Sequence, residues 1–248
     1  MPVKKLLDTG GKWMININDF SIFINNHKLL DSISLSITQG EYFCLIGESG
    51  GGKTLLGKAI LGILPKKFRT SGFIERPNNQ MEIILQDPIG SMQSNVKIGI
   101  QFHHLLKSRG IKSKVKRKKM IDSALQSVGF QSSEKIPLKK PFELSGGICQ
   151  KVAIAMALIS KPRIIIADEP TSALDEQNQE IILKLLDEVC KKDKITLIFI
   201  THDLLIAQRF STHLGVMYKG RLIESGSTKQ VLTYPKEIYT KELIEIFE

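Results

Sequence analysis

A glycine-rich octapeptide is the feature that most constrains the fold of this chain. Residues 47–54 read Gly-Glu-Ser-Gly-Gly-Gly-Lys-Thr, which matches G-x-x-x-x-G-K-[ST]. An apolar run over residues 42–46 precedes it, and apolar residues at helical spacing follow over residues 54–64, up to Pro65. A buried strand that leads through such a loop into a helix is typical of a phosphate-binding loop in an α/β protein with a parallel sheet.

Each residue type in this octapeptide suits the binding of a phosphate. Glycines let backbone N–H groups converge on phosphate oxygens, and the start of a helix adds a favourable potential. We expect Lys53 to reach the β- and γ-phosphates and Thr54 to be a ligand of Mg²⁺. A glycine-rich turn without a ligand is the alternative, and the strand–loop–helix context disfavours it. The predicted nucleotide-binding residues are Gly47, Ser49, Gly50, Gly51, Gly52, Lys53 and Thr54.

Two carboxylates follow a second apolar strand segment, residues 164–167. Ligands of open α/β sheets bind at the carboxyl ends of the strands, where Asp168 and Glu169 would lie. We expect Asp168 to hold Mg²⁺ and Glu169 to orient or deprotonate an attacking water. An acidic pair at the start of an ordinary loop is the alternative when the pair is taken alone.

Length and composition exclude several classes of protein. The chain has 248 residues, enough for one large domain. Its longest apolar run, residues 152–159, is too short for a membrane span, which needs roughly 18 residues. The start of the chain lacks the apolar core of a signal peptide. Its three cysteines, Cys44, Cys149 and Cys190, have no metal-ligand spacing. We therefore expect a protein that works in the cytoplasm unless a partner holds it at a membrane.

A run of basic residues over 107–119 carries much of the formal net charge of +10. Such a run is typical of a solvated helix face. Binding to an anionic membrane surface or to nucleic acid is the alternative. No aromatic residues are interleaved for base stacking, which disfavours nucleic acid.

The order of the motifs resembles the ATP-binding cassette family. In that family they are the Walker A loop, the Q-loop, the signature, Walker B, the D-loop and the switch histidine. In this chain they fall, in order, at residues 47–54, Gln86, 144–147, 164–169, 172–175 and His202. Taken alone, residues 144–147 could be a helix N-cap at Ser145, and His202 a structural histidine at the end of a strand.

The resemblance implies a fold, cofactors and further site residues. The fold would be α/β, a RecA-like parallel-sheet core with a β-rich N-terminal subdomain and a helical insert. The whole chain, 1–248, would be a single ATP-binding domain, with residues 1–89 and 161–248 as the core and 90–160 as the helical subdomain. ATP and Mg²⁺ would be the cofactors. Gln86 would be a ligand of Mg²⁺ and sense the γ-phosphate, and His202 would contact it. Ser145, Gly146 and Gly147 would complete the ATP site of a second subunit.

Five shorter pieces narrow the resemblance to the ATPases of peptide and nickel importers: residues 61–65, 86–88, 142–147, 153–157 and 237–240. This implies an ATPase at the cytoplasmic face of the membrane. Its partners would be transmembrane permease subunits, a second, different ATPase subunit and an extracytoplasmic solute-binding protein. Nickel or a metal chelate would be the first choice of cargo, and short peptides the second. The sequence ends at Glu248, and in this it resembles the short, nickel-importer type.

The sequence departs from the family pattern at two positions. Ile148 stands where the signature usually continues with glutamine, which resembles one subunit type of this subfamily. The adenine-stacking aromatic falls near Ile24, with Phe23 one residue early. Two other functions remain as alternatives: a soluble cassette ATPase that acts on nucleic acid or ribosomes, and a regulatory nucleotide-binding module without turnover.

Overall fold

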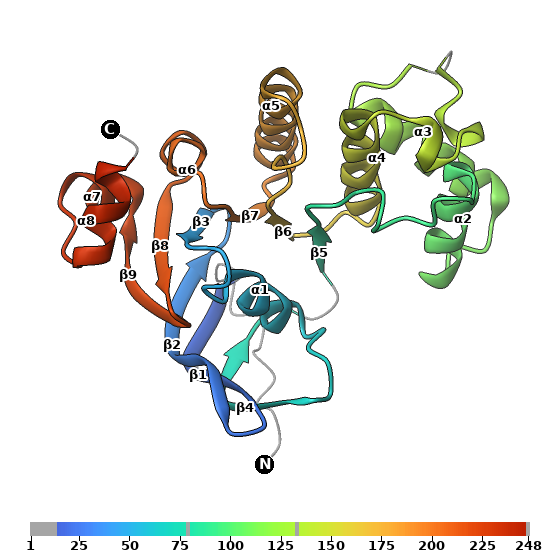
Figure 1. Cartoon of the computed structure of the whole chain (residues 1–248). Coiled ribbons are helices and arrows are strands. Elements are labelled where there is room, and N and C mark those ends of the chain that lie inside the picture. Colours follow the sequence, from blue (N-terminus) through green and yellow to red (C-terminus); the bar gives the residue numbers. More distant parts are fainter. Residues whose placement is uncertain (1–13, 78–79, 132–133, 247–248) are drawn as a thin grey trace.

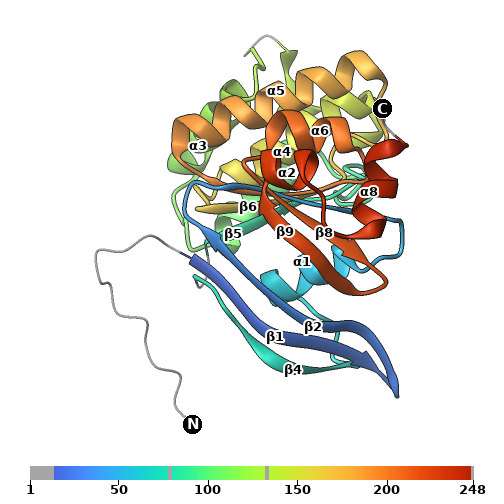
Figure 2. The same cartoon turned by 90° about the vertical axis from the view of Figure 1, so that its left-hand side faces the viewer.

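The structure, a computed structural model, describes residues 14–77, 80–131 and 134–246. The start of the chain, where we expect no signal peptide, and Glu248 lie outside the described residues. Figure 2 shows three layers: a three-stranded sheet, a six-stranded sheet with α1 between the two, and helices on the far side.

The three-stranded sheet is antiparallel, in the order β2-β1-β4. Its strands are β1 (Met14–Ile24), β2 (His27–Thr38) and β4 (Phe68–Glu75). Alternate apolar residues such as Ile15, Ile17, Ile33 and Ile37 are buried, as the period of two predicts. This sheet is the expected β-rich amino-terminal part.

The six-stranded sheet has the order β5-β6-β7-β3-β8-β9. Its strands are β3 (Tyr42–Gly47), β5 (Met81–Ile84), β6 (Ile164–Asp168), β7 (Thr196–Ile200), β8 (His213–Tyr218) and β9 (Arg221–Ser227). All adjacent pairs are parallel except β8 with β9. The predicted parallel sheet is therefore confirmed, and the carboxyl ends of five strands share one edge.

Both faces of this sheet are covered, so its strands are apolar throughout. Along β3, Tyr42, Cys44 and Ile46 belong to the core beneath the outer helices. Phe43 and Leu45 face the opposite way, into the core that includes α1 and the three-stranded sheet.

The first helix is shorter than the sequence suggests. α1 spans Lys53–Leu61, and Gly62 ends it in the left-handed conformation, with φ 74°. The sequence pattern extends to residue 64, because apolar spacing continues past the residue that stops the helix. The helices after β6 are α5 (Glu176–Asp193), α6 (Leu204–Phe210), α7 (Thr228–Thr233) and α8 (Ile238–Glu245).

A group of helices lies between β5 and β6 in the chain and to one side of the sheet in Figure 1. It consists of α2 (Ile98–Ser108), α3 (Lys114–Ser127), the 3₁₀ turns η2 (Ile136–Leu138) and η3 (Pro141–Glu143), and α4 (Gly146–Leu158). All five fall within 90–160, although their apolar side chains join the core of the sheet. The subdomain boundaries themselves stay a prediction.

One member of the basic run has a structural role. Arg117 is buried, 8% exposed, and its guanidinium donates to the carbonyls of Ile111 and Lys112 and to Nδ1 of His103. The lysines of α3 are exposed, as expected for a solvated helix face. Among the described residues, no helix is both long enough and apolar enough to cross a bilayer.

The helical group should depend on its buried phenylalanine. Phe102 is fully buried, whereas Phe142 in the same group is 58% exposed. Phe102→Ala should lower the free energy of unfolding by about 3–5 kcal/mol, because it leaves a cavity in the core. Phe142→Ala should cost less than about 1 kcal/mol. Urea unfolding of both variants checks this, and equal losses would contradict the packing described.

Candidate active site at the carboxyl edge of the sheet

The phosphate loop joins β3 to α1 and needs glycine at several positions. Gly47, Gly50 and Gly52 have φ values of 142°, 81° and 99°, which residues with a side chain rarely adopt. A Cβ on Gly47 would also collide with the carbonyl oxygen of Met217 on the neighbouring strand β8. The loop is thus held tightly against β8.

Lys53 reaches back over the loop from the first residue of α1. Its Nζ donates to the carbonyl oxygens of Gly47 at 2.7 Å and Glu48 at 2.9 Å, and the residue is 5% exposed. Burial lowers the pKa of the Lys53 ammonium, and the carboxylates of Glu169 and Asp168 oppose that shift. This ammonium therefore lies where the loop, the helix and the acidic pair meet.

Thr54 and Asp168 form a polar pair between α1 and β6. The Thr54 hydroxyl donates to Oδ1 of Asp168 at 3.0 Å. Asp168 is 6% exposed, and burial raises the pKa of its carboxyl, against the hydrogen bond from Thr54, which lowers it. The structure thus brings together two of the three residues predicted to hold Mg²⁺.

Glu169 and His202 form a second pair beside the first. Nδ1 of His202 lies 3.1 Å from Oε1 of Glu169. Glu169 has a φ of 46°, unusual for a residue with a side chain, and its backbone N–H donates to the Ile200 carbonyl at 2.8 Å. Strained backbone of this kind often lies at functional sites. The turn after β6 thus directs the carboxylate of Glu169 toward the histidine that follows β7.

Two other predicted residues are exposed at the same edge. Gln86 comes two residues after Ile84, which pairs with Ala167 of β6. It takes no part in the Thr54–Asp168 and Glu169–His202 pairs. Ser49 is exposed within the phosphate loop.

The signature residues lie in a different part of the molecule. Ser145 caps α4, its Oγ accepting from the Ile148 N–H at 3.5 Å. α4 packs on α3, α5 and β5, whereas α1 packs on β3, β6 and β7 (Figure 1). The structure therefore does not bring Ser145, Gly146 and Gly147 to the phosphate loop of their own chain. Ser145 and Gly146 are exposed.

Sequence reasoning missed the residues that support the phosphate loop from behind. The Gly220 N–H donates to the Gly51 carbonyl at 3.1 Å, and Met217 abuts Gly47. Both supporting residues come more than 160 positions later in the chain, on β8 and in the turn after it. A Lys-Gly turn after an apolar strand is the only local signal, and it does not specify a partner.

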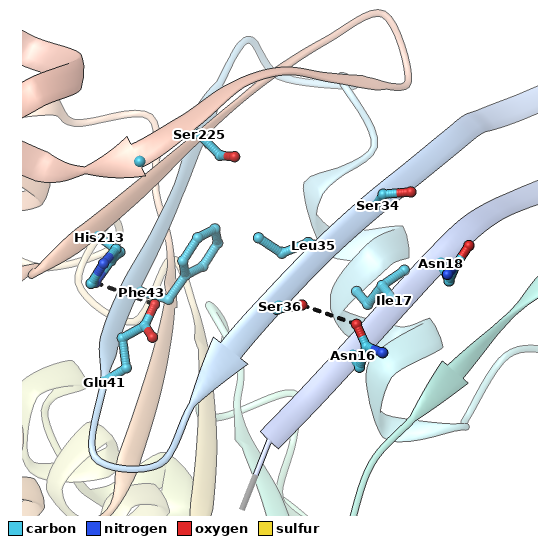
Figure 3. Close-up of a pocket in the computed structure, with 11 residues that line it drawn as sticks. Asn16, Ile17, Asn18, Ser34, Leu35, Ser36, Glu41, Phe43, His213 and Ser225 are labelled. Atoms are coloured by element: carbon cyan, nitrogen blue, oxygen red, sulfur yellow. Dashed lines mark hydrogen bonds and ion pairs between the residues drawn. The ribbon is translucent and has the colours of Figure 1, made fainter. Parts of the chain in front are cut away.

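A cavity of about 440 Å³ lies between the two sheets, near the start of β3 (Figure 3). Glu41 and His213 face each other there, with Oε1 and Nδ1 3.4 Å apart, and Asn16 and Ser36 lie on the opposite wall. None of its lining residues is a predicted site residue. The cavity lies at the amino end of β3, whereas the candidate site lies at the carboxyl end.

Comparison with known proteins identifies the family of this site. The sequence model of the ABC transporter family matches residues 30–172. The dipeptide transport ATP-binding protein of Haemophilus influenzae is 33% identical over 252 residues, which cover 93% of this chain and 76% of the relative. The chain belongs to the ABC transporter family. The oligopeptide transport ATP-binding protein of Streptococcus mutans is 35% identical over 240 residues, covering 89% and 75%.

A solved structure of an ABC transporter component has the same fold. It is cbiO1 from Clostridium perfringens, part of the ABC transporter complex cbiONQ, with a TM-score of 0.76 and 28% identity over 90% of this chain and 92% of that one. The predicted family, the ABC ATPase fold, ATP as the nucleotide and the function as ATPase subunit of an ABC importer are thus confirmed.

The contact between Gly47 and β8 should be essential to nucleotide binding. Gly47→Ala adds a methyl group that collides with the Met217 carbonyl, so ATP affinity should fall on the order of tenfold or more. Gly40→Ala is a matched control, because Gly40 also has a positive φ, 75°, but a Cβ there would meet no atom within 4 Å. It should cost only about 1–2 kcal/mol of stability and leave ATP affinity unchanged. Calorimetric titration of ATP checks both variants, and equal affinities would contradict the tight contact.

Proposed function

We propose that this ABC ATPase hydrolyses ATP at the edge where its phosphate loop, Asp168, Glu169 and His202 meet. One observation carries the proposal: the adjacent residues Asp168 and Glu169 bind Thr54 and His202, respectively, and both carboxylates act on the buried ammonium of Lys53. The ammonium of Lys53 and the first amides of α1 would hold the β- and γ-phosphates. Gly47, Ser49 and the three glycines that follow would shape the loop around them.

The residues at the edge fit Mg²⁺. Its preferred ligands are oxygens, and the Thr54 hydroxyl and the Asp168 carboxylate are already 3.0 Å apart. A cation would also stabilise the ionised form of a carboxyl whose pKa burial raises. Thr54, Asp168 and Gln86 are the proposed ligands. When bound, Mg²⁺ would neutralise negative charge on the phosphates.

Glu169 and His202 would act on the attacking water. Its oxygen bonds to the γ-phosphorus as the bond to the bridging oxygen of ADP breaks, and Glu169 orients the water or takes its proton. The contact at 3.1 Å would let His202 hold the Glu169 carboxylate and reach the γ-phosphate. Gln86 would sense the γ-phosphate from the neighbouring strand end.

A second subunit would complete each site. Because Ser145, Gly146 and Gly147 lie on α4 and away from their own phosphate loop, they would serve the nucleotide of a partner. Ile148 stands where the signature usually has glutamine, and this supports the proposal that the partner is a different ATPase subunit. We also propose the division into an ATP-binding core, 1–89 and 161–248, and a helical subdomain, 90–160.

The partners and the cargo follow from the family. The chain would bind transmembrane permease subunits at the cytoplasmic face of the membrane, as a peripheral subunit served by an extracytoplasmic solute-binding protein. Two relatives more than 30% identical are named for dipeptide and oligopeptide transport, which favours short peptides over nickel or a metal chelate. A solute that stimulates ATP hydrolysis by the assembled complex would identify the cargo.

Removal of the Glu169 carboxylate should stop turnover without preventing binding. Glu169→Gln keeps the shape of the side chain, so ATP should bind while the hydrolysis rate falls by roughly 10²–10⁴. Glu188→Gln, an exposed acid on α5, is the control and should match the wild type. Phosphate release by the full complex measures turnover. Loss of ATP binding in Glu169→Gln would instead make Glu169 a structural residue.

The isolated chain should be mostly monomeric and nearly inactive. Its own half-site is complete, but it lacks a signature supplied by a different subunit. Light scattering and phosphate release with ATP and Mg²⁺ test this before and after addition of the partner and permease subunits, which should restore turnover. A stable homodimer as fast as the full complex would exclude the heterodimer.

A further inference from the structure

The carboxyl-terminal helix α8 places a tyrosine beside the phosphate loop. The ring of Tyr239 stacks on Tyr218, with centroids 4.3 Å apart and planes 26° from parallel. Tyr218 ends β8, directly after Met217, which pairs with Gly47. Figure 1 shows α8 beside β9, the strand that pairs with β8.

The end of β8 supports the phosphate loop at two points. Met217 packs against Gly47, and the N–H of Gly220 donates to the Gly51 carbonyl at 3.1 Å. Tyr218 lies between these two contacts in sequence. A side chain that fixes Tyr218 therefore also fixes the strand end on which the loop rests.

Tyr239 also lies close to the loop itself. Burial raises the pKa of the Tyr239 hydroxyl, and the nearby Glu48 backbone opposes that rise. The Glu48 carbonyl accepts from Lys53 at 2.9 Å and from the Gly51 N–H at 3.1 Å. The stacked tyrosine is therefore next to the loop residue that Lys53 holds.

α8 is itself anchored, so Tyr239 is presented in a fixed position. The carboxylate of Glu224 on β9 accepts from the backbone N–H groups of Lys236 and Glu237, at 2.9 and 3.2 Å. Thr240, next to the tyrosine, is 1% exposed. The neighbouring aromatic Tyr234 is 74% exposed.

We infer that Tyr239 is a positioning residue of the ATP site, which holds the phosphate loop in its ATP-binding conformation through the ring of Tyr218. This rests on the proposed function of the loop. The stacked ring of Tyr239 fixes the end of β8, against which the loop packs. Loss of that ring leaves the loop freer before ATP binds, so that binding must order it.

The experiment compares Tyr239→Ala with Tyr234→Ala in the full complex. Tyr239→Ala removes the ring that stacks on Tyr218, so the KM for ATP should rise about three- to tenfold, as expected for the loss of one aromatic pair. At saturating ATP, kcat should stay within about twofold of the wild type, since the chemistry is unchanged. Tyr239→Phe keeps the ring and should restore a KM close to that of the wild type. Tyr234→Ala should leave both values unchanged.

A purely structural role would lower the thermal stability of Tyr239→Ala without the selective rise in KM, and that result would overturn the inference. So would a KM for Tyr239→Ala equal to that of Tyr234→Ala. A wild-type complex that does not hydrolyse ATP would instead contradict the proposed function, which separates the two failures.

Discussion

The parallel register of β3, β6 and β7 is the constraint on which the rest of the structure depends. Parallel strands end at the same edge, so loops that are distant in sequence meet there. β3 delivers the phosphate loop, β6 delivers Asp168 and Glu169, and β7 delivers His202. Apolar side chains on both faces of these strands fix the register, and the two polar pairs at 3.0 and 3.1 Å are its consequence.

The sequence was sufficient to predict those parts of the site whose residues lie close together in the chain. The phosphate loop and the acidic pair each follow an apolar strand directly, so a short pattern specifies both the fold and the chemistry. It was insufficient where contacts join distant residues, such as Gly220 with Gly51. It also missed β4, because most of that strand is exposed and has little apolar alternation. The predicted end of α1 was wrong because a glycine in the left-handed conformation ends a helix regardless of the apolar pattern.

Side chains in ambiguous sequence positions acquire definite roles from their neighbours. Phe23, near the expected position of an adenine-stacking aromatic, has two cations near its ring, with Lys28 at 5.6 Å and Arg69 at 5.9 Å from the ring centroid. Arg117 looked like one more exposed charge in a basic run, yet it is buried and binds the loop before α3. Neither role follows from residue type or spacing.

The site depends on Lys53 and the loop around it binding the phosphates of ATP. Calorimetric titration of the purified chain with ATP and Mg²⁺ should therefore compare the wild type with Lys53→Ala. ATP affinity should fall about tenfold or more in the variant, because a charge-assisted contact is lost. Unchanged affinity in a folded Lys53→Ala variant would mean that the loop does not bind the phosphates through this lysine.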